Sequence, residues 1–198
     1  MRTLISAMQV TLDGYSRGLD GGSDWVDSWA DGLELLPPVD AFVLGGGMFP
    51  GYQDFWTAVR DAPATAAGML GRDPYPREVD YARVATETPH LVLSTTLTEA
   101  SWPSAQIVGD IGELRALKEQ PGKAVYVVGG PGLLISLINA GMIDELRLIV
   151  HPVAVGSGTA LFAGVDERVS FELMSAEPLA SGRVNLNYRP SNAGGSPS

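Results

Sequence analysis

Apolar residues recur along the chain with two different periods. Short apolar runs bounded by Gly, Pro, Asp or Asn predict β-strands, and such runs lie within residues 2–10, 39–49, 90–97, 104–109, 123–130 and 144–156. Apolar residues spaced three or four positions apart predict helices, and this spacing occurs within residues 25–36, 52–62, 77–86, 110–122 and 131–141. Strands and helices are therefore expected to alternate along most of the chain.

Two segments lack either period and are predicted to be loops. Residues 11–24 are rich in Gly and Asp, and residues 63–76 are punctuated by Pro and Gly. The helix predicted over 25–36 begins after a capping pair, Asp24 and Asp27, and stops at Pro37. Its apolar positions are Val26, Trp29, Leu33 and Leu36.

The C-terminal region has a different pattern. Residues 168–190 alternate between apolar and polar around Ser181-Gly182, which is typical of an antiparallel hairpin. Together with the preceding alternation of strands and helices, this predicts an α/β fold with a mostly parallel sheet that ends in the hairpin. We expect a single domain over residues 1–190 and a disordered tail over 191–198.

Composition and charge exclude several classes of protein. The chain has no cysteine, so disulfides, thiolate metal sites and a cysteine nucleophile are ruled out, and a cytoplasmic setting is expected. A net charge of −10 argues against a general role on nucleic acid. No apolar run approaches the roughly 18 residues of a membrane-spanning helix. The N-terminal apolar run contains Gln9, lacks a small-residue cleavage site, and is predicted to be a strand.

Two predicted strands end in glycines that precede a helix. The first turn holds Gly45, Gly46, Gly47 and Met48, and the second holds Gly129, Gly130, Pro131, Gly132 and Leu133. Helix N-termini at the carboxyl ends of strands bind phosphates, and glycine lets a diphosphate approach the backbone. Tight strand-to-helix turns without a ligand are the alternative. Ser94, Thr95 and Thr96 follow a third strand, where their hydroxyls bind a ribose or simply form a turn.

The order of these motifs resembles the dihydrofolate-reductase-like family, in particular the reductase domain of bifunctional riboflavin-biosynthesis deaminase-reductases. The resemblance rests on SAMQVTLDGY (residues 6–15), HLVLSTTL (90–97) and YVVGGPGLLISLINAGMIDELRLIVHPVAVGSGTALF (126–162). It implies a central sheet of about eight strands flanked by helices, NADPH as cofactor, and hydride transfer to a small heterocycle of the pteridine or ribosylaminopyrimidine type. It also implies a homodimer.

The resemblance carries over to particular residues. The loop from Gly129 to Leu133 matches the family's loop around the cofactor diphosphate, and Ser94 and Thr95 match the segment near the adenosine ribose. Asp13 and Gly14 match the mobile loop beside the nicotinamide, which places Asp13 near the substrate. Many relatives grip the 2′-phosphate with an Arg after the second strand, whereas this chain has LGGGMFPGY (44–52). Arg72 or Arg77 is the candidate substitute.

Hydride transfer also requires a proton and a dry pocket. By the resemblance to dihydrofolate reductases, Asp27 or Asp24 is the carboxylate that faces the pocket, and Asp27 is the candidate proton donor. The alternatives are a helix cap at Asp24 and a solvated acid of the first helical turn at Asp27. Trp25 and Tyr52 are candidate substrate contacts. His151 is expected to be a hydrogen-bonded structural histidine. With His90 as the one other histidine, no metal site is predicted.

Three functions therefore remain open: a reductase, a nucleotide-binding module of the same fold without catalysis, and a flavin-using protein. Without cysteine, the zinc site of the deaminase half is absent, so a stand-alone reductase domain is expected.

Overall fold

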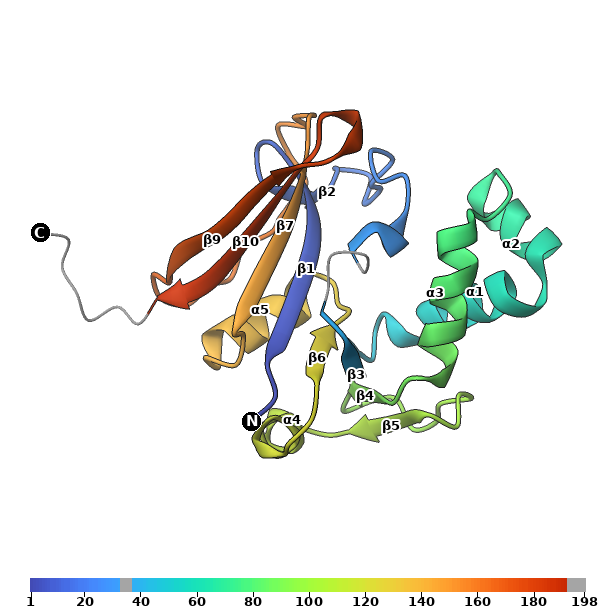
Figure 1. Cartoon of the computed structure of the whole chain (residues 1–198), viewed down its shortest axis with the longest axis horizontal. Coiled ribbons are helices and arrows are strands. Elements are labelled where there is room, and N and C mark those ends of the chain that lie inside the picture. Colours follow the sequence, from blue (N-terminus) through green and yellow to red (C-terminus); the bar gives the residue numbers. More distant parts are fainter. Residues whose placement is uncertain (33–36, 192–198) are drawn as a thin grey trace, which may run out of the picture. The chain divides into compact units, whose positions relative to one another are not determined.

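The computed structural model describes residues 1–32 and 37–191. Its strands form an eight-stranded sheet in the order β5-β4-β3-β6-β1-β7-β10-β9 and a separate pair, β2-β8. The pairs β1/β7, β3/β4 and β4/β5 are parallel, and β10 is antiparallel to both β7 and β9. The predicted α/β class, the mostly parallel sheet of eight strands and the C-terminal antiparallel hairpin are confirmed (Figure 1).

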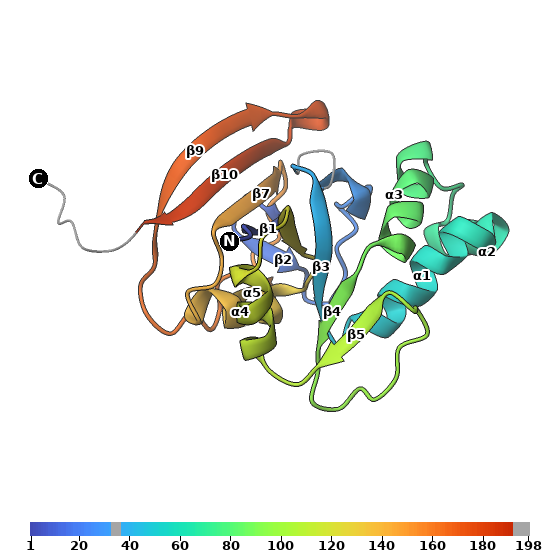
Figure 2. The ribbon, with the colours of Figure 1, turned by 60° about the horizontal axis from the view of Figure 1, so that its bottom comes forward.

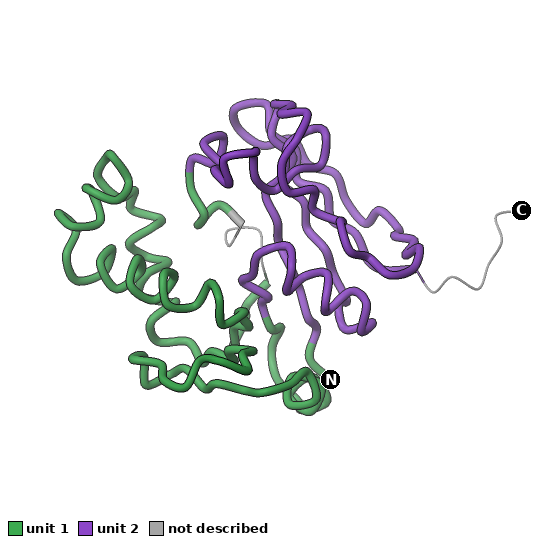
Figure 3. Tube along the Cα trace, turned by 180° about the vertical axis from the view of Figure 1, so that it is seen from behind, with its two compact units in different colours: residues 1–2, 28–125 green, residues 3–27, 126–198 purple. Residues whose placement is uncertain are grey.

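The chain divides into two compact units, shown in different colours in Figure 3. Unit 1 contains residues 1–2 and 28–125, and unit 2 contains residues 3–27 and 126–198. Each unit is described by itself below.

In unit 1, three parallel strands, β3, β4 and β5, are combined with helices. Its elements are the 3₁₀ helix η1 (Trp29–Gly32), β3 (Val39–Gly45), α1 (Phe49–Asp61), α2 (Pro63–Leu70), α3 (Pro76–Glu87), β4 (His90–Leu93), β5 (Ala105–Val108), α4 (Ile111–Glu119) and the start of β6 (Ala124–Val127). Helices α1, α2 and α3 lie together (Figure 2). Phe42 of β3 contacts Tyr81 of α3, so this helical layer packs on the strands through aromatic rings.

In unit 2, the first strand pairs with strands from the end of the chain. Its elements are β1 (Leu4–Thr11), β2 (Tyr15–Arg17), the rest of β6, α5 (Pro131–Asn139), β7 (Glu145–His151), β8 (Thr159–Ala160), β9 (Ser170–Pro178), the 3₁₀ helix η2 (Ala180–Gly182) and β10 (Val184–Ser191). Ser181 and Gly182 have positive φ at the turn between β9 and β10. The predicted hairpin turn is therefore where the pattern placed it, and the two-residue strand β8 was not predicted.

Three segment predictions are wrong. Tyr15–Arg17, within the predicted loop 11–24, form strand β2, because they pair with β8. Residues 63–70 form helix α2 rather than a loop, because Pro63 occupies the first turn, where its missing N–H is no loss. Residues 24–28 form turns and bends, and only the short η1 follows, rather than a helix over 25–36. Trp29, one of the apolar positions of the predicted helix, is 54% exposed rather than buried. Leu33 and Leu36 of that prediction, and tail residues 192–198, lie outside the described residues.

Candidate functional site

The first glycine turn lies in unit 1 between β3 and α1. Strand β3 ends at Gly45, the amide of Met48 donates to the carbonyl of Gly45 at 3.0 Å, and α1 begins at Phe49. No side chain caps the start of α1, and Pro50 stands in its first turn. The first-turn amides of α1 therefore have no side-chain acceptor.

The segment after β4 lies directly beside this turn. The amide of Gly46 donates to the carbonyl of Leu93 at 2.8 Å, and a Cβ added at Gly46 would lie 2.4 Å from the Cβ of Ser94. The Ser94 Oγ accepts from the amides of Thr96 and Leu97, at 3.2 and 2.9 Å. Unit 1 thus brings Gly45–Met48 and Ser94–Thr96 together, and the Ser94 hydroxyl also forms a local turn.

The second glycine turn lies in unit 2 between β6 and α5. Gly130 is the N-cap of α5, with φ −74° and ψ 173°, and no side chain caps this helix. Among the residues that the structure describes, a Cβ added at Gly130 or Gly132 would meet nothing within 4 Å, whereas at Gly129 it would lie 2.8 Å from Leu133 Cδ2. Neither the backbone conformation nor the packing of Gly130 requires glycine.

Helices α3 and α4 carry side-chain acceptors at their N-termini, whereas α2, like α1 and α5, has none. The Asp110 carboxylate accepts from the amide of Gly112 at 2.5 Å, at the start of α4. At α3, the Glu78 carboxylate accepts from the amide of Tyr75 at 2.8 Å. The helices that follow the two glycine turns lack such an acceptor, which leaves their N-termini suited to an anion from outside the chain.

Hydrogen bonds of Asp13 connect the loop after β1 with the loop after β7 in unit 2. Its carboxylate accepts from the Thr11 hydroxyl at 2.6 Å and from the amides of Val155 and Gly156 at 3.1 and 2.7 Å. These bonds, that of Thr11 first, hold the pKa of Asp13 below its ordinary value. Gly14 next to it has φ +81°, and its carbonyl accepts from the amide of Leu161.

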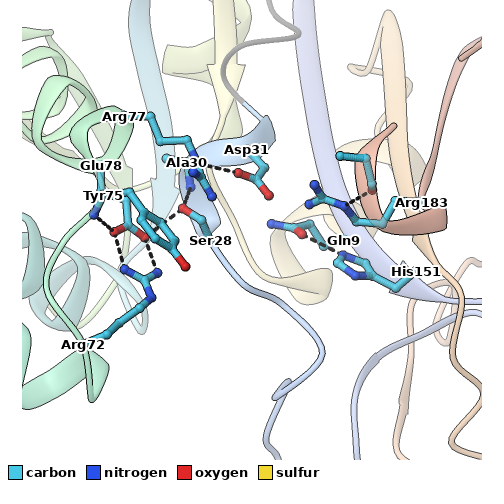
Figure 4. A network of polar contacts seen from close by, with 11 residues as sticks. Gln9, Ser28, Ala30, Asp31, Arg72, Tyr75, Arg77, Glu78, His151 and Arg183 are labelled. Atoms are coloured by element: carbon cyan, nitrogen blue, oxygen red, sulfur yellow. Dashed lines mark hydrogen bonds and ion pairs between the residues drawn. The ribbon is translucent and has the colours of Figure 1, made fainter. Parts of the chain in front are cut away.

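A buried polar pair in unit 2 was not predicted. The Nε2 of His151 and the Oε1 of Gln9 are 2.8 Å apart, and both residues are buried (Figure 4). Thr11 pairs with His151 across β1 and β7, so the pair lies at the carboxyl end of two parallel strands. No local sequence pattern links positions 9 and 151. Arg183, which donates from Nε to the carbonyl of Ala180, appears in the same view.

A second polar network, in unit 1, was also missed. The buried Glu78 carboxylate receives two bonds of 2.9 Å from Arg72 and one of 2.8 Å from the Ser28 hydroxyl (Figure 4). Burial alone raises the pKa of Glu78, but the hydrogen bonds from Arg72, the Tyr75 amide and Ser28 lower it below its ordinary value. We name this group, Ser28, Arg72, Tyr75 and Glu78, the Glu78 clasp.

Both candidate arginines for the 2′-phosphate are engaged in unit 1. Arg72 belongs to the Glu78 clasp, and the Nε of Arg77 donates to Asp31 at 2.9 Å. The two guanidinium groups lie 3.7 and 4.4 Å from the ring centroid of Tyr75. Carboxylates therefore already neutralise both cations.

The candidate proton donor and substrate contacts lie in different surroundings. Asp27 is exposed on a bend, and Trp25 is half-buried in a turn of unit 2. Tyr52 is buried in unit 1, where its hydroxyl is hydrogen-bonded to that of Tyr81. Tyr52 thus packs in the aromatic core together with Phe42, Phe49, Trp56, His90 and Trp102.

His90 is fully buried among these rings. Its Nδ1 is 2.7 Å from the carbonyl of Thr88, and its Nε2 has no hydrogen-bond partner among residues 1–32 and 37–191. Burial lowers the pKa of His90 to about 4, so the ring is neutral at pH 7. Over residues 1–32 and 37–191, no three His, Asp or Glu side chains gather as a metal site would require, and no helix is long and apolar enough to cross a bilayer.

Known proteins share this sequence pattern and fold. The family model described as "RibD C-terminal domain" matches residues 2–184. The uncharacterized proteins YyaP and YwjB of Bacillus subtilis (strain 168) are 30% and 26% identical, each aligned over 94% of this chain and over 94% and 97% of their own lengths.

Solved structures agree on the fold. A putative riboflavin biosynthesis protein from Shewanella sp. PV-4 matches with a TM-score of 0.63 at 21% identity, over 96% of this chain and 99% of that one. A dihydrofolate reductase from Enterococcus faecalis, complexed with NADP(H), matches with a TM-score of 0.56 at 16% identity, over 96% and 97%. With a family model that matches almost the whole sequence, the chain belongs to the RibD C-terminal domain family, a family of reductase-like proteins.

Proposed function

We propose that this protein is an NADPH-dependent reductase that transfers a hydride to a small heterocycle of the pteridine or ribosylaminopyrimidine type. The observation that carries the proposal is the second glycine turn. Gly130 and Gly132 have open space where a Cβ would stand, and the helix they begin has no cap. A diphosphate resting on these amides explains both features.

The first glycine turn and the Ser94–Thr96 segment supply the other proposed cofactor contacts. Gly47 has nothing within 4 Å of an added Cβ, and Thr95 and Thr96 are exposed. Main-chain amides and hydroxyls of this kind suit phosphate and ribose oxygens. When bound, the nicotinamide supplies the hydride, and the chain orients it.

The proton is proposed to come from Asp27, the exposed carboxylate between Trp25 and Ser28. Replacing Asp27 by Asn should lower kcat by about 10²-fold or more, since general-acid catalysis contributes on that order. Asp24→Asn, three residues earlier on the same exposed segment, is the matched control and should leave kcat unchanged. If Asp27→Asn has the same kcat as Asp24→Asn, the proton comes from another group.

Calorimetric titration with NADPH, with NADH and FMN in parallel, tests the cofactor directly. Gly130→Val should weaken NADPH binding by tenfold or more while the Tm stays within a few degrees, because the added side chain occupies the ligand's place rather than the core's. Gly68→Val, at an exposed glycine of α2 that also has open space, is the control.

Each arm of the titration has a defined meaning. If only FMN binds, the cofactor is a flavin and not a nicotinamide nucleotide. NADPH binding without turnover of dihydrofolate, of ribosylaminopyrimidine phosphates or of other acceptors would favour a nucleotide-binding module. Unchanged affinity in Gly130→Val would mean that the glycines only form turns.

A further inference from the structure

A hollow lies in unit 2, at the opposite end of α5 from the glycine turn. It has a volume of about 450 Å³, within the range of small-molecule pockets. The walls come from the end of α5, the segment before β7, the start of β9 and the end of β10, and the residues are Ile138, Gly141, Ile143, Asp144, Arg168, Val169, Ser170, Arg189, Pro190 and Ser191. Helix α5 has nine residues, so its two ends are about 13 Å apart.

The lining of this hollow combines an apolar floor with cationic groups. Ile138, Ile143, Val169 and Pro190 supply the apolar surface. The guanidinium of Arg189 is held by Glu172 through two bonds of 3.0 and 2.7 Å. Arg168 has no hydrogen bond or ion pair with any described residue. Arg168, which is exposed, is therefore the arginine of the lining that no carboxylate among the described residues holds in an ion pair.

Asp144, the acidic residue of the lining, is hydrogen-bonded to the backbone of β1. Asp144 Oδ2 accepts from the amide of Leu4 at 2.7 Å, and the amide of Asp144 donates to the carbonyl of Leu4 at 2.9 Å. These two bonds join the amino ends of β1 and β7. Asp144 thus fixes one wall of the hollow, and Arg168 with the Ser170 hydroxyl remains to meet a ligand.

We propose that this hollow binds a small amphipathic anion, an aromatic or aliphatic body with one carboxylate, sulfonate or phosphate group. The apolar body lies on the floor, and the acidic group lies at Arg168, where a charge-assisted hydrogen bond is stronger than a neutral one. The proposal is independent of the proposed reductase activity, because no residue of the hollow belongs to the glycine turns or to the loop of Asp13.

The test uses 1-anilinonaphthalene-8-sulfonate, a fluorescent amphipathic anion, on the folded full-length protein at pH 7. N-phenyl-1-naphthylamine, which keeps the aromatic rings and lacks the sulfonate, is the matched neutral probe. Arg168→Gln should weaken sulfonate binding about tenfold and leave the neutral probe unaffected. Arg115→Gln, at an exposed and unpaired arginine of α4, should change neither probe.

Two further variants locate the binding site. Val169→Glu, which puts a carboxylate into the hollow, should weaken both probes. Gly130→Val should alter neither, because it lies at the far end of α5. No binding of the sulfonate, equal sulfonate affinity in Arg168→Gln, or loss of sulfonate binding in Gly130→Val would each overturn the proposal.

Discussion

The two glycine turns look alike in sequence, but different physical causes explain their glycines. At Gly46, a side chain would collide with Ser94, 2.4 Å away. At Gly130, a side chain would meet nothing, and φ is −74°, which any residue adopts. The fold therefore explains glycine at position 46 and leaves it unexplained at position 130. The same motif, a strand followed by glycines and a helix, is thus needed for packing at Gly46, whereas at Gly130 we propose that it serves a ligand.

Acid should affect the first turn most strongly, because its neighbouring strand begins at buried His90. Burial lowers the pKa of His90 to about 4 from 6.5. Since the folded state binds the proton more weakly than the unfolded state, stability is complete above pH 6.5 and is lost as pH falls towards 4. The loss is at most about 3 kcal/mol. Urea unfolding at a series of pH values measures it.

The control for this prediction is His90→Asn, which keeps a donor for the carbonyl of Thr88 and does not titrate. The variant should be less stable than the wild type at pH 7, and the gap should narrow towards pH 4. Parallel stability curves for the two proteins would show that His90 does not carry the acid sensitivity.

The second-largest effect should come from filling the first turn. Gly46→Ala should lower the free energy of unfolding by about 2 kcal/mol, because overpacking forces backbone shifts. Gly47→Ala, at the next position but in open space, should change it by less than about 0.5 kcal/mol. Ser94→Gly should restore part of the stability of Gly46→Ala. Equal unfolding midpoints for the two alanine variants would remove the distinction between the turns.

A smaller effect is expected where a helix carries its own cap. Asp110→Ala removes the carboxylate that accepts from the amide of Gly112 and should cost about 1 kcal/mol. Asp110→Asn, which still accepts this bond, should recover most of it. Thermal denaturation followed by circular dichroism gives both values.

The smallest change in stability is expected for Gly130→Asp, which should nevertheless weaken NADPH binding strongly. Gly130→Asp gives α5 its missing cap and should raise stability by a few tenths of a kcal/mol. Its carboxylate then occupies the amides proposed for the diphosphate, so NADPH affinity should fall more than tenfold. Gly130→Asn, which caps the helix without adding a charge, should lose less NADPH affinity than Gly130→Asp. Full NADPH affinity in Gly130→Asp, measured by calorimetry, would contradict the assignment of this helix start.

The spacing of apolar residues predicts most of the strands and helices correctly. The strand that ends at Gly45 and the helix that begins at Pro131 stand where the pattern placed them, because burial on a sheet or helix face repeats with a fixed period. The pattern failed where a local signal had two meanings. Pro63 was interpreted as a breaker and starts α2, and Trp29 was interpreted as a buried position and is exposed.

The Glu78 clasp and the pair of Gln9 and His151 could not be predicted from neighbouring residues in the sequence. The Ser28 hydroxyl and the Glu78 carboxylate are 50 residues apart in sequence, and Gln9 and His151 are 142 apart. Nothing in the neighbourhood of either residue marks its partner. The open space at Gly130 was likewise invisible, because a sequence shows that a residue is glycine but not which atoms surround it.

The division of the chain into units bears on how it folds during synthesis. Apart from its first two residues, unit 1 is one continuous stretch, 28–125, and all of it can leave the ribosome before unit 2 is complete. Strand β1 emerges first, yet it pairs with β7, and the bond from Leu4 to Asp144 spans 140 residues. Contacts of such separation form slowly, and nascent chains fold from the N-terminus as segments appear. The first strand to be made therefore waits for β7, and a chain stalled before residue 145 leaves that edge of β1 unpaired.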